Sequence, residues 1–172
     1  VIPVHVIGVI RLIDAGDKDD KLIAVPADSP FAKATSMADL DEHFPGVTTI
    51  LRTWFENYKG KGALQCSGFG SRADAEALLA AAIESVRRQT HERFELIVVD
   101  DGSTDDTGAL LAAIAAQDAR VRVITNVRSL GGPLARNVAI LAARADFVTG
   151  LDDDDTFAPG RLARFAGAWR RH

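Results

Sequence analysis

Four aspartates in a row, Asp152–Asp155, follow directly on the apolar run DFVTGL at residues 146–151. Adjacent carboxylates repel one another, and either full solvation or a bound cation relieves the repulsion. A second acidic pair, Asp100 and Asp101 in VVDDGST, also follows an apolar run. Carboxylates with no His or Cys nearby favour Mg²⁺ or Mn²⁺ over Zn²⁺. The residue types thus predict either a metal site or solvated turns, and the fold must decide between them.

A third acidic stretch, DAGDKDD, places Asp14 and Asp19 five residues apart, with Lys21 just beyond. Two carboxylates and an ammonium on one hairpin loop can share a metal–phosphate cluster, the chemistry of metal-assisted hydrolysis. A solvated turn accounts for the same residues without a ligand. The spacing alone leaves both interpretations open.

The elements that must position these residues change in pattern at about residue 72. Before it, strand patterns dominate, and the first two strands form a hairpin around DAGDKDD. The expected strands are 4–13, 21–26 and 63–68, and one amphipathic helix is expected over 47–59. The first half is therefore predicted to be α+β, an antiparallel hairpin plus a helix.

After residue 72, short apolar strands alternate with helices. The predicted strands are 94–100, 121–125 and 146–151, and the predicted helices are 72–89, 107–117, 133–145 and one from about 159. This alternation is typical of right-handed βαβ units and a parallel sheet, the α/β class. In such sheets ligands bind beyond the carboxyl ends of the strands. If strands 94–100 and 146–151 are near neighbours, the two acidic stretches converge on one crevice.

Composition excludes several function classes. The 172 residues are 47% hydrophobic and 26% charged, with a net charge of −4, which argues against a nucleic-acid surface or attraction to anionic lipid. The apolar N-terminal stretch is too short to cross a bilayer, so no transmembrane segment is expected. A single cysteine, Cys66, excludes an intrachain disulfide and favours a reducing, cytoplasmic location.

Three ordered motifs in residues 72–172, namely VVDDGS, ARN and LDDDDTF, closely resemble the nucleotide-sugar half of the family 2 glycosyltransferases, inverting enzymes with the GT-A fold. The resemblance implies that Asp100 and Asp101 contact the nucleoside and that Arg136 lies near the diphosphate. It also implies a nucleotide diphosphate sugar as ligand. One departure stands out, because relatives open with a strand of the type VSVIIPTYN where this chain has ALQCSGFGSR.

The same resemblance assigns the metal. The D-x-D motif of the family, here Asp152 and Asp154 with Asp155 beside them, holds Mg²⁺ or Mn²⁺ on the diphosphate. The acceptor-binding half with its catalytic base would follow His172, so we expect binding without glycosyl transfer.

The first part of the chain, to about residue 80, looks like the C-terminal part of the family I soluble inorganic pyrophosphatases. The stretches DAGDKDDKLIAVP and WFENYKGK carry the resemblance. It implies that Asp14 and Asp19 are metal ligands, that Lys21 contacts a phosphate of pyrophosphate, and that Tyr58 and Lys59 grip another. The preceding part of such an enzyme would lie before Val1, so this site too is expected to be incomplete.

The chain therefore resembles the C-terminal part of one enzyme, in segment 1–71, joined to the N-terminal part of another, in segment 72–172. The stretch ALQCSGFGSRADAEALL fits both sides of the join, and strand 63–68 could serve as a surrogate first strand of the parallel sheet. Because both active sites are expected to be incomplete, the sequence does not decide whether the chain is an enzyme. A residual pyrophosphatase and a recombined structural fold without ligand remain as alternatives, and exposed strand edges favour a homo-oligomer.

Overall fold

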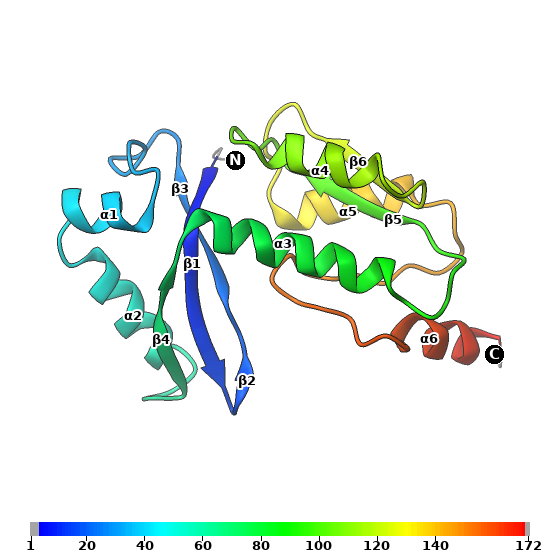
Figure 1. The fold of residues 1–172 in the computed structure, drawn as a ribbon, viewed down its shortest axis with the longest axis horizontal. Helices are drawn as coiled ribbons and strands as arrows, with labels where there is room; N and C mark the ends of the chain where they lie inside the picture. The colour runs from blue at the N-terminus through cyan, green and yellow to red at the C-terminus, as the bar shows by residue number, and fades with distance from the viewer. Residues whose placement is uncertain (1–3, 171–172) are drawn as a thin grey trace. The chain divides into compact units, whose positions relative to one another are not determined.

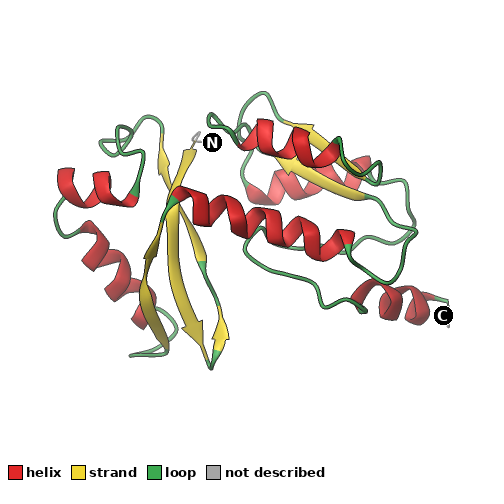
Figure 2. Ribbon diagram, in the orientation of Figure 1, coloured by secondary structure: helices red, strands yellow, loops and turns green. Residues whose placement is uncertain are grey.

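The structure is a computed structural model that describes residues 4–170. The chain forms two compact units whose boundary lies at Leu79–Ala80, inside helix α3 (Arg72–Arg87). We call them the N-terminal unit and the C-terminal unit. The elements of both are shown in Figures 1 and 2.

The N-terminal unit is built around the long strand β1 (Val4–Asp14). Three strands pair with it in antiparallel fashion: β2 (Asp17–Lys18), β3 (Lys21–Pro26) and β4 (Leu64–Gly70). Two helices, α1 (Met37–His43) and α2 (Val47–Asn57), belong to the same unit. The predicted hairpin and the helix at 47–59 are confirmed, whereas α1 was not predicted.

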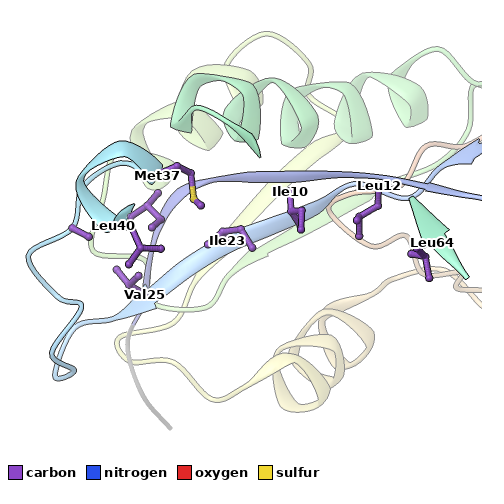
Figure 3. Packing of buried hydrophobic residues seen from close by; sticks show 9 residues of the cluster. Ile10, Leu12, Ile23, Val25, Met37, Leu40 and Leu64 are labelled. Carbon is purple, nitrogen blue, oxygen red and sulfur yellow. The ribbon is translucent and has the colours of Figure 1, made fainter. Parts of the chain in front are cut away.

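One face of this sheet carries the main hydrophobic core, shown in Figure 3. Its buried members are Ile7, Ile10, Leu12, Ile23, Val25, Ala34, Met37, Leu40 and Leu64. Gly8 lets α1 approach β1 closely, because a Cβ at this position would lie 2.5 Å from the Met37 side chain and from the Gly70 carbonyl oxygen. The short helix α1 thus closes the core, and Ser36 caps it by accepting a hydrogen bond from the Asp39 backbone N–H at 3.0 Å.

The C-terminal unit contains a two-stranded parallel sheet. Strands β5 (Leu96–Asp100) and β6 (Val121–Thr125) pair from Leu96↔Val121 to Asp100↔Thr125. Helices α4 (Thr107–Ala115), α5 (Gly132–Ala142) and α6 (Arg161–Trp169) follow the predicted order. The parallel βαβ pattern predicted for this half is confirmed.

Two strand predictions are wrong. Residues 146–151 form no strand, and the whole segment between α5 and α6 is loop in Figure 2. Strand β4 does not join the parallel sheet but pairs with β1, from Val9↔Gly70 to Asp14↔Leu64. A strand needs a partner for its backbone groups, and with β4 used in the other sheet, the run 146–151 has none.

Candidate phosphate and metal sites

All five residues predicted for a pyrophosphatase-like site lie together near the turn of the β1–β2 hairpin in the N-terminal unit. The Lys59 ammonium donates to Asp14 Oδ2 at 2.6 Å and to Asp19 Oδ2 at 3.3 Å. The Lys21 ammonium lies 2.8 Å from Asp19 Oδ1. Tyr58, the C-cap of α2, presents its ring 5.7 Å from the Lys59 ammonium. We call these residues the hairpin cluster.

The local sequence explains how the hairpin cluster forms. Ala15 and Gly16 have φ angles of 50° and 97°, which are the left-handed values that a two-residue hairpin turn of the mirror-image type requires. This turn pairs Asp14 with Asp17. The C-terminal end of α2 then delivers Lys59 to the hairpin from a distant part of the sequence.

The electrostatics of the hairpin cluster keep its carboxylate and ammonium groups charged. Partial burial raises the pKa of Asp19, but hydrogen bonds and charge from Lys21 and Lys59 outweigh it, so the pKa lies below the usual value. The pKa of Lys59 is raised, chiefly by its hydrogen bond to Asp14. Asp19 therefore stays ionised and Lys59 stays protonated throughout the neutral range.

Sequence reasoning missed two supporting residues. Asp20 Oδ1 accepts a hydrogen bond from the Leu12 backbone N–H at 3.0 Å, which ties the loop back to β1. Trp54 stacks on Tyr58 with ring centroids 4.9 Å apart and thereby fixes the tyrosine ring. The i, i+4 spacing of Trp54 and Tyr58 on a helix was the available signal for the second contact.

In the C-terminal unit, the aspartates of VVDDGST organise their own loops. Asp100, only 4% exposed, accepts a hydrogen bond from the Ser103 backbone N–H at 2.9 Å. Asp101 accepts from Asn126 Nδ2 and Ser129 Oγ, both at 2.7 Å. It also accepts from the backbone N–H groups of Leu130 (2.9 Å) and Gly131 (2.8 Å). Asp101 thereby holds the loop that leads into α5.

These hydrogen bonds set the protonation state of Asp101. Burial raises its pKa, yet the donors from Asn126, Ser129 and the loop backbone together bring the pKa below the usual value. The family resemblance implied that this carboxylate contacts the nucleoside, and the structure shows that it shapes the loop.

The other predicted nucleotide-binding residue, Arg136, lies near the start of α5 and pairs with Asp152. The guanidinium Nη2 is 2.7 Å from Asp152 Oδ1, and both side chains are 61% exposed. Asp155 donates its backbone N–H to the Asp152 carbonyl oxygen at 3.2 Å, which forms a turn in the four-aspartate run. Asp154 is half-buried within that turn.

A metal bound at the hairpin cluster or at the four-aspartate run would need ligands that the described part of the protein does not supply. Among residues 4–170, no three His, Cys, Asp or Glu side chains are placed to hold one ion. The two carboxylates of the hairpin cluster already share one ammonium, and oxygen donors suit Mg²⁺. Asp14 and Asp19, or Asp152 with a neighbour in its turn, could hold a Mg²⁺ only if water or phosphate supplied its remaining ligands.

Comparison with known proteins identifies both parts of the chain. The family model described as Glycosyl transferase family 2 matches residues 72–172. Residues 72–172 belong to glycosyltransferase family 2. The Inorganic pyrophosphatase model matches residues 1–87, so the chain belongs to that family as well. The two matches overlap on residues 72–87, which are helix α3.

Curated relatives match the glycosyltransferase part. "Putative colanic acid biosynthesis glycosyl transferase WcaA" of Escherichia coli is 39% identical over 52% of this chain and 32% of its own length. "Succinoglycan biosynthesis protein ExoO" of Rhizobium meliloti is 49% identical over 48% and 23%. A UDP-Glc:alpha-D-GlcNAc-diphosphoundecaprenol beta-1,3-glucosyltransferase, WfgD of Escherichia coli, is 36% identical over 52% and 34%. The chain thus spans about a quarter to a third of these relatives.

Among solved structures, the inorganic pyrophosphatase of Schistosoma japonicum is 35% identical, with a TM-score of 0.42. That match covers 46% of this chain and 30% of the other. The two resemblances noted in the sequence are confirmed by the family matches. No helix among residues 4–170 is long and apolar enough to cross a membrane.

Proposed function

We propose that the glycosyltransferase part of the chain binds a nucleotide diphosphate sugar together with Mg²⁺ or Mn²⁺. The observation that carries this proposal is the exposed ion pair of Arg136 and Asp152 next to the loop held by Asp101. It offers a cation for the diphosphate and a carboxylate for the metal on one accessible surface. A metal bound there would neutralise phosphate charge and join the diphosphate to Asp152. We assign no residue to glycosyl transfer itself.

In this proposal Asp101 positions the binding surface, and Arg136 and Asp152 contact the ligand. Asp101 keeps the loop 126–131 closed, so that α5 begins at a fixed place and presents Arg136. Arg136 can exchange its bond to Asp152 for a phosphate, since guanidinium groups bind phosphate oxygens in bidentate fashion. This exchange would free Asp152 for the metal, with Asp154 and Asp155 in the same turn.

Calorimetric titration tests this proposal. UDP-glucose and UDP, the former chosen because one relative is named for UDP-glucose, are titrated with Mn²⁺ into the chain and into Asp152→Asn. Binding is expected for the parent chain, with affinity lowered about tenfold or more in the variant. Asp153→Asn is the matched control, because it removes the same charge one residue away. Equal heats for the parent chain and Asp152→Asn would overturn the proposal.

A second candidate function is pyrophosphate binding by the hairpin cluster. It is favoured by the convergence of Asp14, Asp19, Lys21 and Lys59 through contacts of 2.6–3.3 Å. Titration of pyrophosphate with Mg²⁺ should show binding that Lys59→Met weakens about tenfold and Lys61→Met leaves unchanged. Release of phosphate is measured in parallel. Binding and release that are both unaffected by Lys21→Ala would reject this candidate.

The alternative of a recombined fold without any ligand makes an opposite prediction. A ligand that binds only the native state must raise the melting temperature, by mass action. Melting curves with UDP and Mn²⁺, and separately with pyrophosphate and Mg²⁺, distinguish the two proposals from this alternative. An unchanged melting temperature in both would favour the alternative.

A further inference from the structure

The open edge of strand β5 is an unusual feature of the C-terminal unit. Within residues 4–170, β5 pairs with β6 alone, and the sheet has two strands. Parallel sheets are normally larger and buried on both faces, and sheets of so few strands are marginal. The edge carries only apolar residues, Ile97 and Val99, without the lysine, proline or bulge that usually protects an exposed edge.

The backbone of this edge is ready for hydrogen bonding. The Leu96 N–H donates to the Arg120 carbonyl oxygen at 2.8 Å, and the Asp100 carbonyl oxygen accepts from the Asn126 N–H at 2.9 Å. Leu96, Val98 and Asp100 therefore turn their backbone groups toward β6. Since alternate residues of a strand face opposite edges, Ile97 and Val99 turn theirs to the open side. These groups repeat every ~6.6 Å, the two-residue repeat of a strand.

A cavity of about 800 Å³ lies along this open edge. Residues of strand β5 and of the loop segment 145–153 line it. Helices α5 and α6 contribute apolar side chains that include Ala135, Ala139, Leu162 and Phe165. We call this cavity the strand slot. All of its walls belong to the C-terminal unit.

Two contacts anchor the segment 145–153 near the two ends of β5. At the amino end of β5, the Arg144 backbone N–H donates to Glu95 Oε1 at 2.6 Å. At the other end, Asp152 pairs with Arg136 on α5, just beyond the loop that Asp101 holds at the carboxyl end of β5. Between these anchors Phe147 and Val148 are 42% and 47% exposed. The slot is thus bounded by one strand and by a loop segment that forms no strand.

We propose that the strand slot binds an extended apolar segment of another polypeptide, which adds to β5 as a third parallel strand. The row of backbone groups at strand spacing selects an extended chain over a compact small molecule, since only a chain can bond to Ile97 and Val99 in series. A second copy of this chain would not fit if it inserted its own β5 into the slot. That strand carries β6 on its other edge, and this β6 would collide with segment 145–153 of the first copy.

Charge at the two ends of the slot defines the partner further. Arginines outnumber carboxylates at the amino end. Arg93 lines the slot just before β5, and Arg122 and Arg144 pair with Glu95. Asp146, two residues after Arg144, is the other carboxylate there. At the carboxyl end, Asp152 and Asp153 outnumber Arg136. A strand parallel to β5 therefore fits best when an acidic residue precedes its apolar run and a basic residue follows it.

Fluorescence anisotropy with synthetic peptides tests this inference. The labelled, capped peptide EVIVIVK should bind, whereas KVIVIVE, with its end charges exchanged, should bind about tenfold more weakly. EVPVPVK should not bind, because proline lacks the N–H that a ladder needs. Ala139→Trp, which fills the slot, should abolish binding, and Leu141→Trp, on the exposed face of the same helix, should not.

Hydrogen exchange of the parent chain provides the decisive readout and does not depend on a variant that folds. EVIVIVK should slow exchange of the Ile97 and Val99 amides about tenfold or more, while Val98, which already faces β6, changes little. Equal binding of EVIVIVK and EVPVPVK, or binding without protection of Ile97 and Val99, would overturn the inference. So would protection of these amides by self-association of the chain alone.

Discussion

At the scale of single residues, the carboxylates noted in the sequence make two kinds of contact: ion pairs with lysine and hydrogen bonds with loop groups. Asp14 and Asp19 share the Lys59 ammonium in a partly exposed cluster. Asp100 and Asp101 instead accept hydrogen bonds from their own loops. Residue type and spacing predicted that Asp14 and Asp19 lie together. The expected convergence of the other two acidic stretches depended on a strand at 146–151, which does not form. They could not predict Asp101's role, because its side-chain and backbone donors lie 25 to 30 residues away in the sequence.

The first prediction concerns Asp101→Asn. An amide offers one acceptor oxygen to four donor groups, so we expect the free energy of unfolding to fall by about 1–3 kcal/mol at pH 7. Because the pKa of Asp101 is lowered in the fold, the carboxylate stabilises the protein above about pH 4–5, and this stabilisation is lost as the pH falls toward the folded-state pKa. The difference between parent and variant should therefore shrink in acid.

Urea unfolding at several pH values measures this difference. The exposed Asp146→Asn serves as the control and should change stability by no more than about 0.5 kcal/mol. A stability difference for Asp101→Asn that is absent at pH 7, or that grows as the pH falls, contradicts the assigned role.

At the scale of elements, local pattern predicted most strands and helices well. β3 and β6 have the predicted bounds, and the helices of the βαβ part follow in the predicted order. The run 146–151 has the composition of a strand but no partner, and pairing depends on residues far away in the sequence. α1 escaped prediction because it is one short helix, placed by contacts such as Met37 against Gly8.

Turn geometry gives the second prediction. Ala15 is the one non-glycine residue with positive φ among residues 4–170, at 50°. A positive φ is sterically unfavourable for a residue with a Cβ atom. Ala15→Gly should remove this strain and raise the free energy of unfolding by roughly 0.5–1 kcal/mol. The exposed Ala38→Gly in α1 should lower it by about 1 kcal/mol, since helices disfavour glycine. Thermal and urea unfolding of both variants check the prediction, and a loss of stability in Ala15→Gly would contradict it.

The third prediction concerns the contact between the loop after β5 and the loop before α5. A Cβ at Gly102 would lie 2.7 Å from the Ser129 backbone nitrogen, and Gly102 has a φ of 81°. Gly102→Ala should therefore cost about 2–4 kcal/mol. Gly46→Ala has a similar φ of 95° but open space around it, so it should cost only about 1 kcal/mol. Equal effects on unfolding would show that the loop contact is unimportant.

At the scale of the whole molecule, the chain joins parts of two enzyme families through one helix. Residues 1–87 match inorganic pyrophosphatases and residues 72–172 match family 2 glycosyltransferases, with α3 common to both. Sequence motifs were sufficient to recognise both families. They could not show that strand β4 stays in the antiparallel sheet, so that β5 keeps an open edge. That outcome depends on which of two sheets the shared strand joins.

We propose that metal and nucleotide meet at the Arg136–Asp152 surface of the glycosyltransferase part. Paramagnetic broadening by Mn²⁺ in ¹H–¹⁵N spectra locates the metal residue by residue. With UDP present, we predict that substoichiometric Mn²⁺ broadens the amide signals of residues 152–155 and of Arg136, and that UDP is required for this effect. Broadening that is absent there, or that appears only around Asp14 and Asp19, would contradict the claim.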